Sequence, residues 1–304
     1  MLGSRLDLDI CIPTWNSSLF LDCCLRQIKA NCEGLRYRVT IVDNASSDTT
    51  CSIAREHGCR IWVKQQSMPD ALNQLTKAST ARHTLFMHAD TVLLNPQWYA
   101  LTTAKLTGST ALVSPQDIGC GPYSRPGGIG MPESSFMLFN TRQLKQLYKL
   151  RWVQRFRLST PQRYVNFYSG SVTHYIPGEL QRKGYNWHAM QVHISPEESE
   201  AVFSPDRRNR CCWSESLAKL RYGLGNFYSL DGVLTHYHNW YDRILGEHEG
   251  NDAPPRGDGI PNAYIAQRSR VFLDDYAANA IRIPSPLSKE QAPQAIPFLE
   301  PLPS

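Results

Sequence analysis

The sequence predicts an α/β fold with a doubly wound, mostly parallel sheet flanked by helices. Its 304 residues are enough for one large α/β domain or two small ones. In the amino-terminal third, short apolar runs alternate with segments whose apolar residues recur at helical spacing, as in parallel sheets with crossover helices. Polar residues follow each apolar run, which is where such sheets bind their ligands.

Four strands and three helices are expected in this third, in alternation. The strands are expected at LDICIP, RVTIVDN, CRIWVK and HTLFMHAD. The first helix follows the first strand, and Ser17 or Ser18 can cap it. The second, SSDTTCSIAREHG, has Asp48 near its start and Gly58 just past its end. The third is expected at MPDALNQLTKAS.

Composition and charge exclude several classes of protein. The net charge of +5 is mild and no block of like charges occurs, so nucleic acid is not expected as a partner. The nine cysteines are an odd number without a CxxC spacing, which favours reduced thiols in the cytoplasm. No run approaches the roughly twenty apolar residues of a membrane span. Because the first strand begins close to Met1, no cleavable leader is expected, and peripheral membrane attachment stays open.

The run TLFMHADTVLLNP places two polar residues at the end of an apolar strand. Residues two apart in a strand point to the same face, so His88 and Asp90 are expected to project together. An aspartate at a strand end is often only a turn former. The polar ends of the other three strands favour a binding site over that alternative.

Three stretches, DICIPTWN, VTIVDNASSDTT and LFMHADTVL, together resemble the family 2 glycosyltransferases. The resemblance covers residues 6–100 well and the remainder loosely. It implies a GT-A fold with a smaller mixed acceptor-side region, and transfer of a sugar from a nucleotide diphosphate to a hydroxyl of a glycan, polysaccharide or glycoconjugate, with inversion. It divides the chain into a nucleotide-sugar-binding half (1–115), an acceptor-binding half (116–245), and a loop, helix and proline-rich tail (246–304).

The resemblance also implies nucleotide contacts at the strand ends. Pro13, Thr14 and Asn16 would lie at the nucleotide, and the carboxylate of Asp43 would accept a hydrogen bond from the base. Asn73, in the third expected helix, matches a position where the family commonly has asparagine.

HAD stands where the family has its D-x-D motif, which implies that Asp90 holds the divalent cation bridging the donor diphosphate. His88 replaces the first acid of that motif. Because imidazole suits Mn²⁺ better than the hard Mg²⁺, the replacement favours manganese or a weakly bound metal. The alternative role for His88 is a hydrogen bond to a ribose hydroxyl.

A further metal ligand is expected from GVLTHYHNWYDR, because GT-A enzymes often bring a late histidine to the metal. His236 and His238 alternate along an extended run, so both are expected on one face. We favour His236, which follows the apolar GVL directly. The alternative is that these histidines are buried and hydrogen-bonded in an aromatic-rich strand.

An inverting transferase needs a general base, worth roughly 10²–10⁴ in rate. The family usually supplies an acid from an ED-like pair ahead of a helix that ends in Gly-Tyr. The matching stretch FYSGSVTHYIPGELQRKGY has no such pair. His174 is the first candidate, Glu179 the second, although it also suits a helix start, and Glu133, after the glycine-rich loop, the third.

Two other functions fit parts of the sequence. A catalytically degenerate sugar-nucleotide or glycan-binding protein would account for His88 and for the missing acidic pair, and turnover would distinguish it. A nucleotidyltransferase would use the same strand-end acids. That class needs a glycine-rich, basic phosphate loop after its first strand, and PTWNSS is not one.

Overall fold

The structure is a computed structural model that describes residues 5–116, 132–147, 155–160, 163–168, 172–173, 176–193, 225–239, 270–275 and 277–278. The strands are β1 (Leu8–Thr14), β2 (Tyr37–Asp43), β3 (Arg60–Val63), β4 (His83–Met87), β5 (Thr91–Leu93), β6 (Thr110–Pro115), β7 (Phe136–Asn140), β8 (Arg155–Thr160), β9 (Arg163–Tyr168), β10 (Asn186–His193), β11 (Gly225–Leu230) and β12 (Val233–Asn239). The helices are α1 (Ser18–Asn31), α2 (Thr50–Glu56), α3 (Met68–Ala78), α4 (Trp98–Lys105), α5 (Thr141–Gln146) and α6 (Ile176–Arg182).

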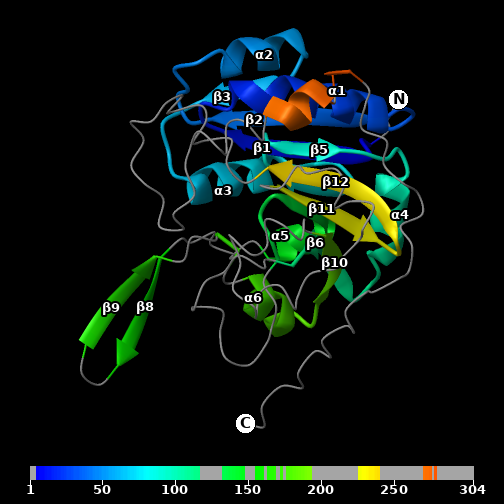
Figure 1. Cartoon of the computed structure of the whole chain (residues 1–304). Coiled ribbons are helices and arrows are strands. Elements are labelled where there is room, and N and C mark those ends of the chain that lie inside the picture. The colour runs from blue at the N-terminus through cyan, green and yellow to red at the C-terminus, as the bar shows by residue number, and fades with distance from the viewer. Residues whose placement is uncertain are drawn as a thin grey trace.

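A ten-stranded sheet runs through the molecule in the order β3-β2-β1-β4-β7-β6-β10-β11-β12-β5 (Figure 1). The first four strands in this order pair in parallel, as do β6 and β10. The other neighbours are antiparallel. The predicted α/β class, with a large central sheet flanked by helices, is confirmed. The sheet as a whole is mixed rather than mostly parallel, because five of the nine neighbouring strand pairs that the structure describes in it are antiparallel. Strands from both predicted halves share this sheet, and the division of the chain at residues 115 and 245 stays a prediction.

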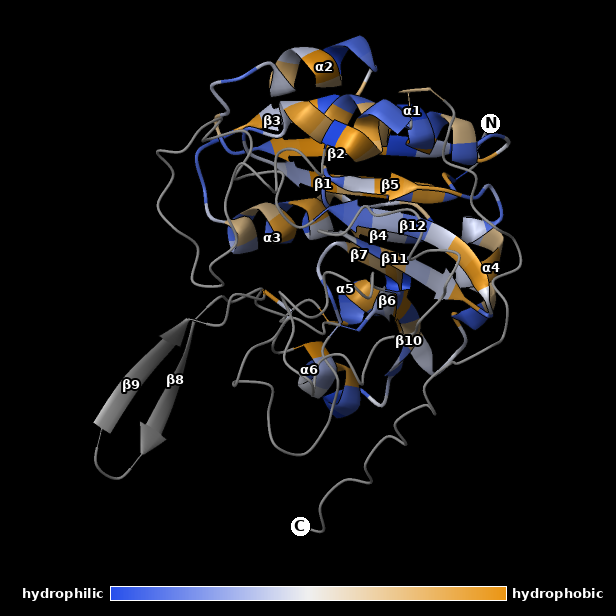
Figure 2. Ribbon diagram, in the orientation of Figure 1, coloured by the Kyte–Doolittle hydropathy of each residue, from blue (hydrophilic) through white to orange (hydrophobic). Residues whose placement is uncertain are grey.

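Helices cover both faces of the sheet because successive side chains of a strand point to opposite faces, and apolar residues occur on both. In β1, Leu8, Ile10 and Ile12 pack against α1, α2 and α4, whereas Cys11 packs on the opposite face with α3, α5 and α6. In Figure 2, α1 and α3 carry both hydrophobic and hydrophilic residues, as expected of helices that cover a sheet. Each fully buried Leu or Ile contributes about 1.5–3 kcal/mol. Among the described residues, no helix is long and apolar enough to cross a membrane.

A third apolar cluster lies at the β12 edge of the sheet. Phe272, from the helical segment 270–275, stacks on Tyr237 of β12 with ring centroids 4.1 Å apart. It also stacks on Phe20 of α1 at 6.2 Å. The carboxy-terminal segment therefore packs on the strand that carries His236 and His238, beside α1 (Figure 1).

The start of β4 holds a buried neutral histidine. The Nδ1 atom of His83 lies 2.8 Å from the hydroxyl of Tyr99. Burial, followed by the charges of Arg82 and Arg5, lowers the pKa of His83 to about 4. An unfolded histidine titrates near 6.5, so between about pH 6.5 and pH 4 the unfolded chain binds a proton that the folded chain does not. The stability due to this histidine is fully present above that range and is lost as the pH falls through it.

We expect His83→Asn, which keeps a hydrogen-bonding atom near the place of Nδ1, to reduce the loss of stability between pH 6.5 and pH 4. Urea unfolding at a series of pH values measures this slope, with wild type as the reference. An identical slope in the two proteins would show that His83 is not a source of the acid sensitivity.

Candidate functional site

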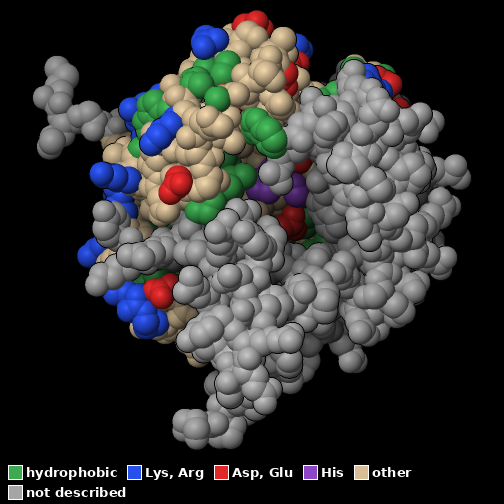
Figure 3. Space-filling view, turned by 90° about the vertical axis from the view of Figure 1, so that its left-hand side faces the viewer, with side chains coloured by type: hydrophobic (Ala, Val, Ile, Leu, Met, Phe, Trp, Pro, Cys, Tyr) green, Lys and Arg blue, Asp and Glu red, His purple; other side chains and the backbone are tan. Residues whose placement is uncertain are grey.

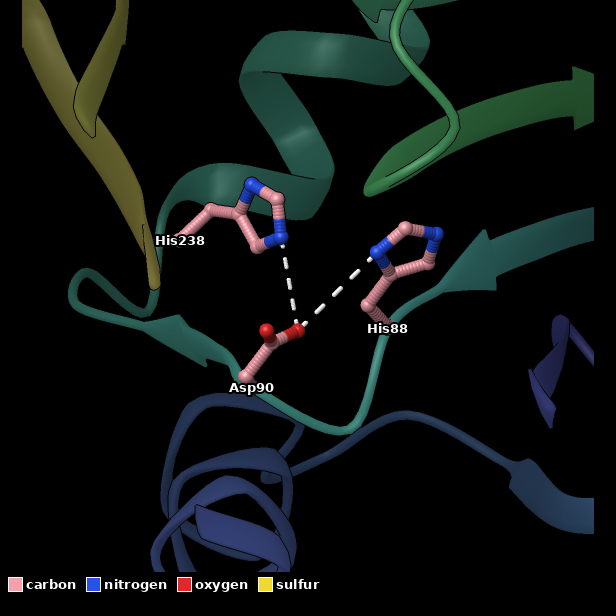
Figure 4. A group of neighbouring side chains, drawn as sticks. All are labelled: His88, Asp90 and His238. Atoms are coloured by element: carbon pink, nitrogen blue, oxygen red, sulfur yellow. Dashed lines mark ion pairs between the residues drawn. The ribbon is translucent and has the colours of Figure 1, made fainter. Parts of the chain in front are cut away.

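Three side chains meet beyond the carboxyl end of β4: His88, Asp90 and His238 (Figure 4). His88 and Asp90 lie in the turn between β4 and β5. His238 comes from β12, which pairs antiparallel with β5 so that His238 is opposite Thr91. The backbone N–H of Asn239 donates to the carbonyl of Asp90, at 3.1 Å. This pairing of β5 with β12 brings His238 to the turn that carries Asp90.

The side chains are close enough to share one ion. His238 Nε2 lies 3.3 Å from Asp90 Oδ1, and His88 Nδ1 lies 3.9 Å from the same oxygen. One ligand atom from each residue falls within 4.8 Å of the others. The exposed fraction of the side chain is 28% for His88, 12% for Asp90 and 6% for His238. The cluster is therefore reached from the side of His88, and Figure 3 shows histidine and acidic side chains together on this face.

A second carboxylate lies behind His238. Glu133 Oε1 is 2.8 Å from His238 Nδ1. The N–H does not point straight at that oxygen, so the contact is an ion pair rather than an aligned hydrogen bond. Ser135 Oγ donates to Oε1 at 2.7 Å, and the hydroxyl of Tyr228 donates to Oε2 at 2.6 Å. His238 is thus held between Asp90 on one ring nitrogen and Glu133 on the other.

The two carboxylates control the charge of this histidine. Burial by itself lowers the pKa of His238, but the nearby carboxylates of Asp90 and Glu133 outweigh it and raise the value to about 10. Burial likewise opposes ionisation of both acids, yet His238 lowers the pKa of each below its ordinary value. The raised pKa favours the imidazolium form of His238, and a cation that binds Nε2 would displace a proton from that form.

His236, the favoured candidate for a further metal ligand, lies outside the cluster that contains Asp90 and His238. It is fully buried and stacks between Phe136 and Tyr228, with ring centroids at 4.2 and 4.6 Å. Its Nδ1 is 2.9 Å from Thr235 Oγ1. The reason is strand register: His236 is opposite Leu93 in β5, two residues further from the turn that carries Asp90.

The predicted nucleotide residues converge at the ends of β1 and β2. Thr14 is opposite Asp43 in the parallel pair. The fully buried carboxylate of Asp43 accepts hydrogen bonds from Thr14 Oγ1 at 2.8 Å, and from the N–H and hydroxyl of Ser46 at 2.8 and 2.6 Å. Asp43 therefore braces the two strand ends. Because this carboxylate is fully buried, a base could hydrogen-bond to it only if surrounding groups move.

Asn16 connects the same strand ends. Pro13 and Asn73, the other two residues predicted at the nucleotide, differ in exposure. The side-chain oxygen of Asn16 accepts from the N–H of Ser47 at 2.9 Å, and its φ of +44° turns the chain out of β1. Pro13 is buried in β1, whereas Asn73 is exposed on α3.

The three candidate bases have different surroundings. His174 lies outside the described residues. Glu179 is in the first turn of α6, as expected for an acid at a helix start, and its carboxylate pairs with Arg182 at 2.6 Å. Glu133 belongs to the cluster around His238. Ser135 and Tyr228, which bind Glu133, are not among the residues that the sequence singles out. Ser135 could have been found from the sequence, because residues two apart on an extended chain point to the same side and Ser135 is two residues after Glu133. No local sequence pattern connects Tyr228 with Glu133.

Residues 9–157 match the family model for Glycosyl transferase family 2, and this match includes the ends of β1 and β2 together with His88, Asp90 and Glu133. The chain carries a glycosyl transferase family 2 domain. The resemblance noted from the three sequence stretches is thereby confirmed. His238, the remaining member of the cluster, lies beyond the matched residues.

Several solved structures are similar to the chain. TarS (residues 1–349) from S. aureus is 17% identical, with 49% of this chain and 50% of that chain covered and a TM-score of 0.37. Glucosyl-3-phosphoglycerate synthase from Mycobacterium tuberculosis is 17% identical over 60% and 68%, with a TM-score of 0.42. The mannosyltransferase PcManGT from Pyrobaculum calidifontis is 14% identical over 93% and 77%, with a TM-score of 0.44.

These structures are distant from this chain, with identities of 14–17% and TM-scores of 0.37–0.44. The chain spans about half the length of the TarS structures that it matches. No curated protein matches the sequence.

Proposed function

We propose that the protein is an inverting glycosyltransferase that moves a sugar from a nucleotide diphosphate to a hydroxyl of a glycan or glycoconjugate, with a divalent cation held by His88, Asp90 and His238. One observation carries this proposal: within a chain with a family 2 domain, these three side chains converge at the carboxyl end of a sheet strand. Ligands of doubly wound sheets bind at such ends.

The residues present fit a divalent cation. They offer one carboxylate and two imidazoles whose ligand atoms lie within 4.8 Å of one another, on a cluster that is open at His88. Two nitrogen ligands favour Mn²⁺ over Mg²⁺, which prefers an all-oxygen environment. When bound, the cation would act as a Lewis acid on the donor diphosphate, which is worth several kcal/mol to the departure of the leaving group.

The nucleotide is expected next to the metal, at the ends of β1 and β2. Thr14 and Asn16 supply polar groups there, and Asp43 holds the loop that follows β2 in place through Ser46. Pro13 limits the conformation of the β1 end. Asn73, exposed on α3, remains a candidate contact.

The general base that we propose is His174. Glu179 is engaged by Arg182, and Glu133 has protein donors on both oxygens. Val172 and Thr173, just before His174, are buried ahead of α6. The acceptor hydroxyl would give up its proton to His174 as the bond to the sugar forms.

Calorimetric titration with UDP, GDP, dTDP and CDP, each without metal and with Mn²⁺ or Mg²⁺, tests the proposal. We expect one nucleoside diphosphate to bind, to require metal, and to bind more tightly with Mn²⁺ than with Mg²⁺. If none of the four binds under any metal condition, the transferase proposal is wrong and the degenerate glycan-binding alternative is favoured.

A further inference from the structure

Glu133 has three protein partners around its carboxylate. Its Oε1 accepts from Ser135 and faces His238 Nδ1, and its Oε2 accepts from Tyr228. The Tyr228 hydroxyl in turn accepts from Asn226 Nδ2, at 3.2 Å. A general base needs a free lone pair within reach of the acceptor. The oxygens of Glu133 are instead directed at its own chain.

The backbone of Glu133 is held as firmly as its side chain. Its N–H donates to the carbonyl of Pro115, at 2.8 Å, and its carbonyl accepts from Ser114 Oγ, at 3.1 Å. Both partners belong to the end of β6. The backbone of Glu133 is therefore anchored to β6, and two hydroxyl donors orient its carboxylate.

We propose that Glu133 is the positioning residue of the metal centre: it accepts the Nδ1 proton of His238 and so keeps the Nε2 lone pair directed at the cation beside Asp90. This inference rests on the proposed function. A neutral imidazole carries one proton, and the hydrogen bond at one ring nitrogen decides which nitrogen is free to bind metal. The Nδ1 to Oε1 distance of 2.8 Å is within hydrogen-bond range. Rotation of the imidazole about its broad terminal torsion aligns the N–H.

The charge of Glu133 also suits this role. With His238 neutral, the cluster carries two negative charges, on Asp90 and Glu133, which match one divalent cation. A glutamine at position 133 would remove one of these charges. It would also direct an amide N–H at a site where Ser135 or Tyr228 already donates. Ligand basicity and orientation at His238 would both suffer.

We expect Glu133→Gln to weaken Mn²⁺ binding by about 10–100-fold, the usual effect of removing the carboxylate behind a histidine ligand. Electron paramagnetic resonance of free Mn²⁺ measures the affinity directly, without turnover. Tyr228→Phe removes the donor to Oε2 together with the acceptor of Asn226 Nδ2, and keeps the carboxylate. It is expected to weaken binding by a smaller factor and provides a second variant if Glu133→Gln does not fold.

Asp9→Asn is the matched control. Asp9 is also a buried carboxylate that faces a cation, with Arg38 at 2.6 Å and the N–H groups of Thr80 and Ala81 at 2.6 and 2.9 Å. It lies near the opposite end of β1 from Thr14. We expect this variant to lose stability but to keep the Mn²⁺ affinity of wild type, so that a general loss of stability is separated from a loss at the metal.

The outcomes are distinct. If Glu133→Gln and Tyr228→Phe both bind Mn²⁺ as wild type does, the positioning role is wrong. If Glu133→Gln keeps its Mn²⁺ affinity but loses turnover by roughly 10²–10⁴, Glu133 is the base and the inference is overturned. If wild type itself binds no Mn²⁺, the failure belongs to the metal site of the proposed function.

Discussion

Asp90→Asn is expected to abolish metal-dependent donor binding and to lower the rate of transfer by about a thousand-fold or more. Both histidines of the cluster face the same oxygen of Asp90, so this side chain is the centre of the proposed metal site. A cation contributes several kcal/mol at the leaving group, and each 1.4 kcal/mol is about tenfold in rate. Calorimetry with the preferred diphosphate and Mn²⁺, together with a steady-state transfer assay, measures both effects.

The control for this variant must show that the fold survives. The substitution keeps the shape of the side chain but leaves His238 with Glu133 as its one carboxylate neighbour in the described cluster. Asp7→Asn, at a partly exposed acid that pairs with Arg36 near the start of β1, is a surface comparison expected to bind donor normally. An Asp90→Asn protein that is folded and still needs Mn²⁺ to bind the diphosphate would exclude Asp90 as a ligand.

Substitutions of the two histidines of β12 are expected to affect different properties of the protein. His238→Gln should weaken Mn²⁺ binding by about a hundred-fold or more, because it removes the buried imidazole nearest Asp90. His236→Gln should leave Mn²⁺ binding near that of wild type but lower the free energy of unfolding by about 1–3 kcal/mol. Its ring is fully buried between Phe136 and Tyr228, and an amide fills that space poorly. Mn²⁺ titration and urea unfolding of both variants provide the comparison.

This pair of variants decides between the two interpretations of GVLTHYHNWYDR. Both substitutions replace a histidine on the same strand, so a general effect on β12 would appear in both proteins. Loss of Mn²⁺ binding in His236→Gln alone would restore the preference based on sequence and would contradict the register of β12 against β5.

The amino-terminal strands and helices could be predicted because their signals are local. Alternation of apolar residues in β1 and helical spacing in α1 are each contained in a single element. The position of Asp90 at the end of β4 follows from the same local pattern. The exposure of individual polar groups could not be predicted in this way. The sequence position of Asp43 suggests an accessible carboxylate, yet this carboxylate is fully buried and hydrogen-bonded to Thr14 and Ser46.

The sequence by itself determined the fold class, the strand ends at which ligands are expected, the family resemblance, and His88 with Asp90 as neighbours. Tertiary structure decided which histidine of β12 lies beside Asp90 and which carboxylate contacts the other ring nitrogen of that histidine. His238 rather than His236 reaches Asp90 because of strand register, and Glu133 reaches His238 because Tyr228 and Ser135 orient it. Pairing of β5 with β12 joins segments distant in the chain, so its register depends on the packing of the whole sheet rather than on a local pattern.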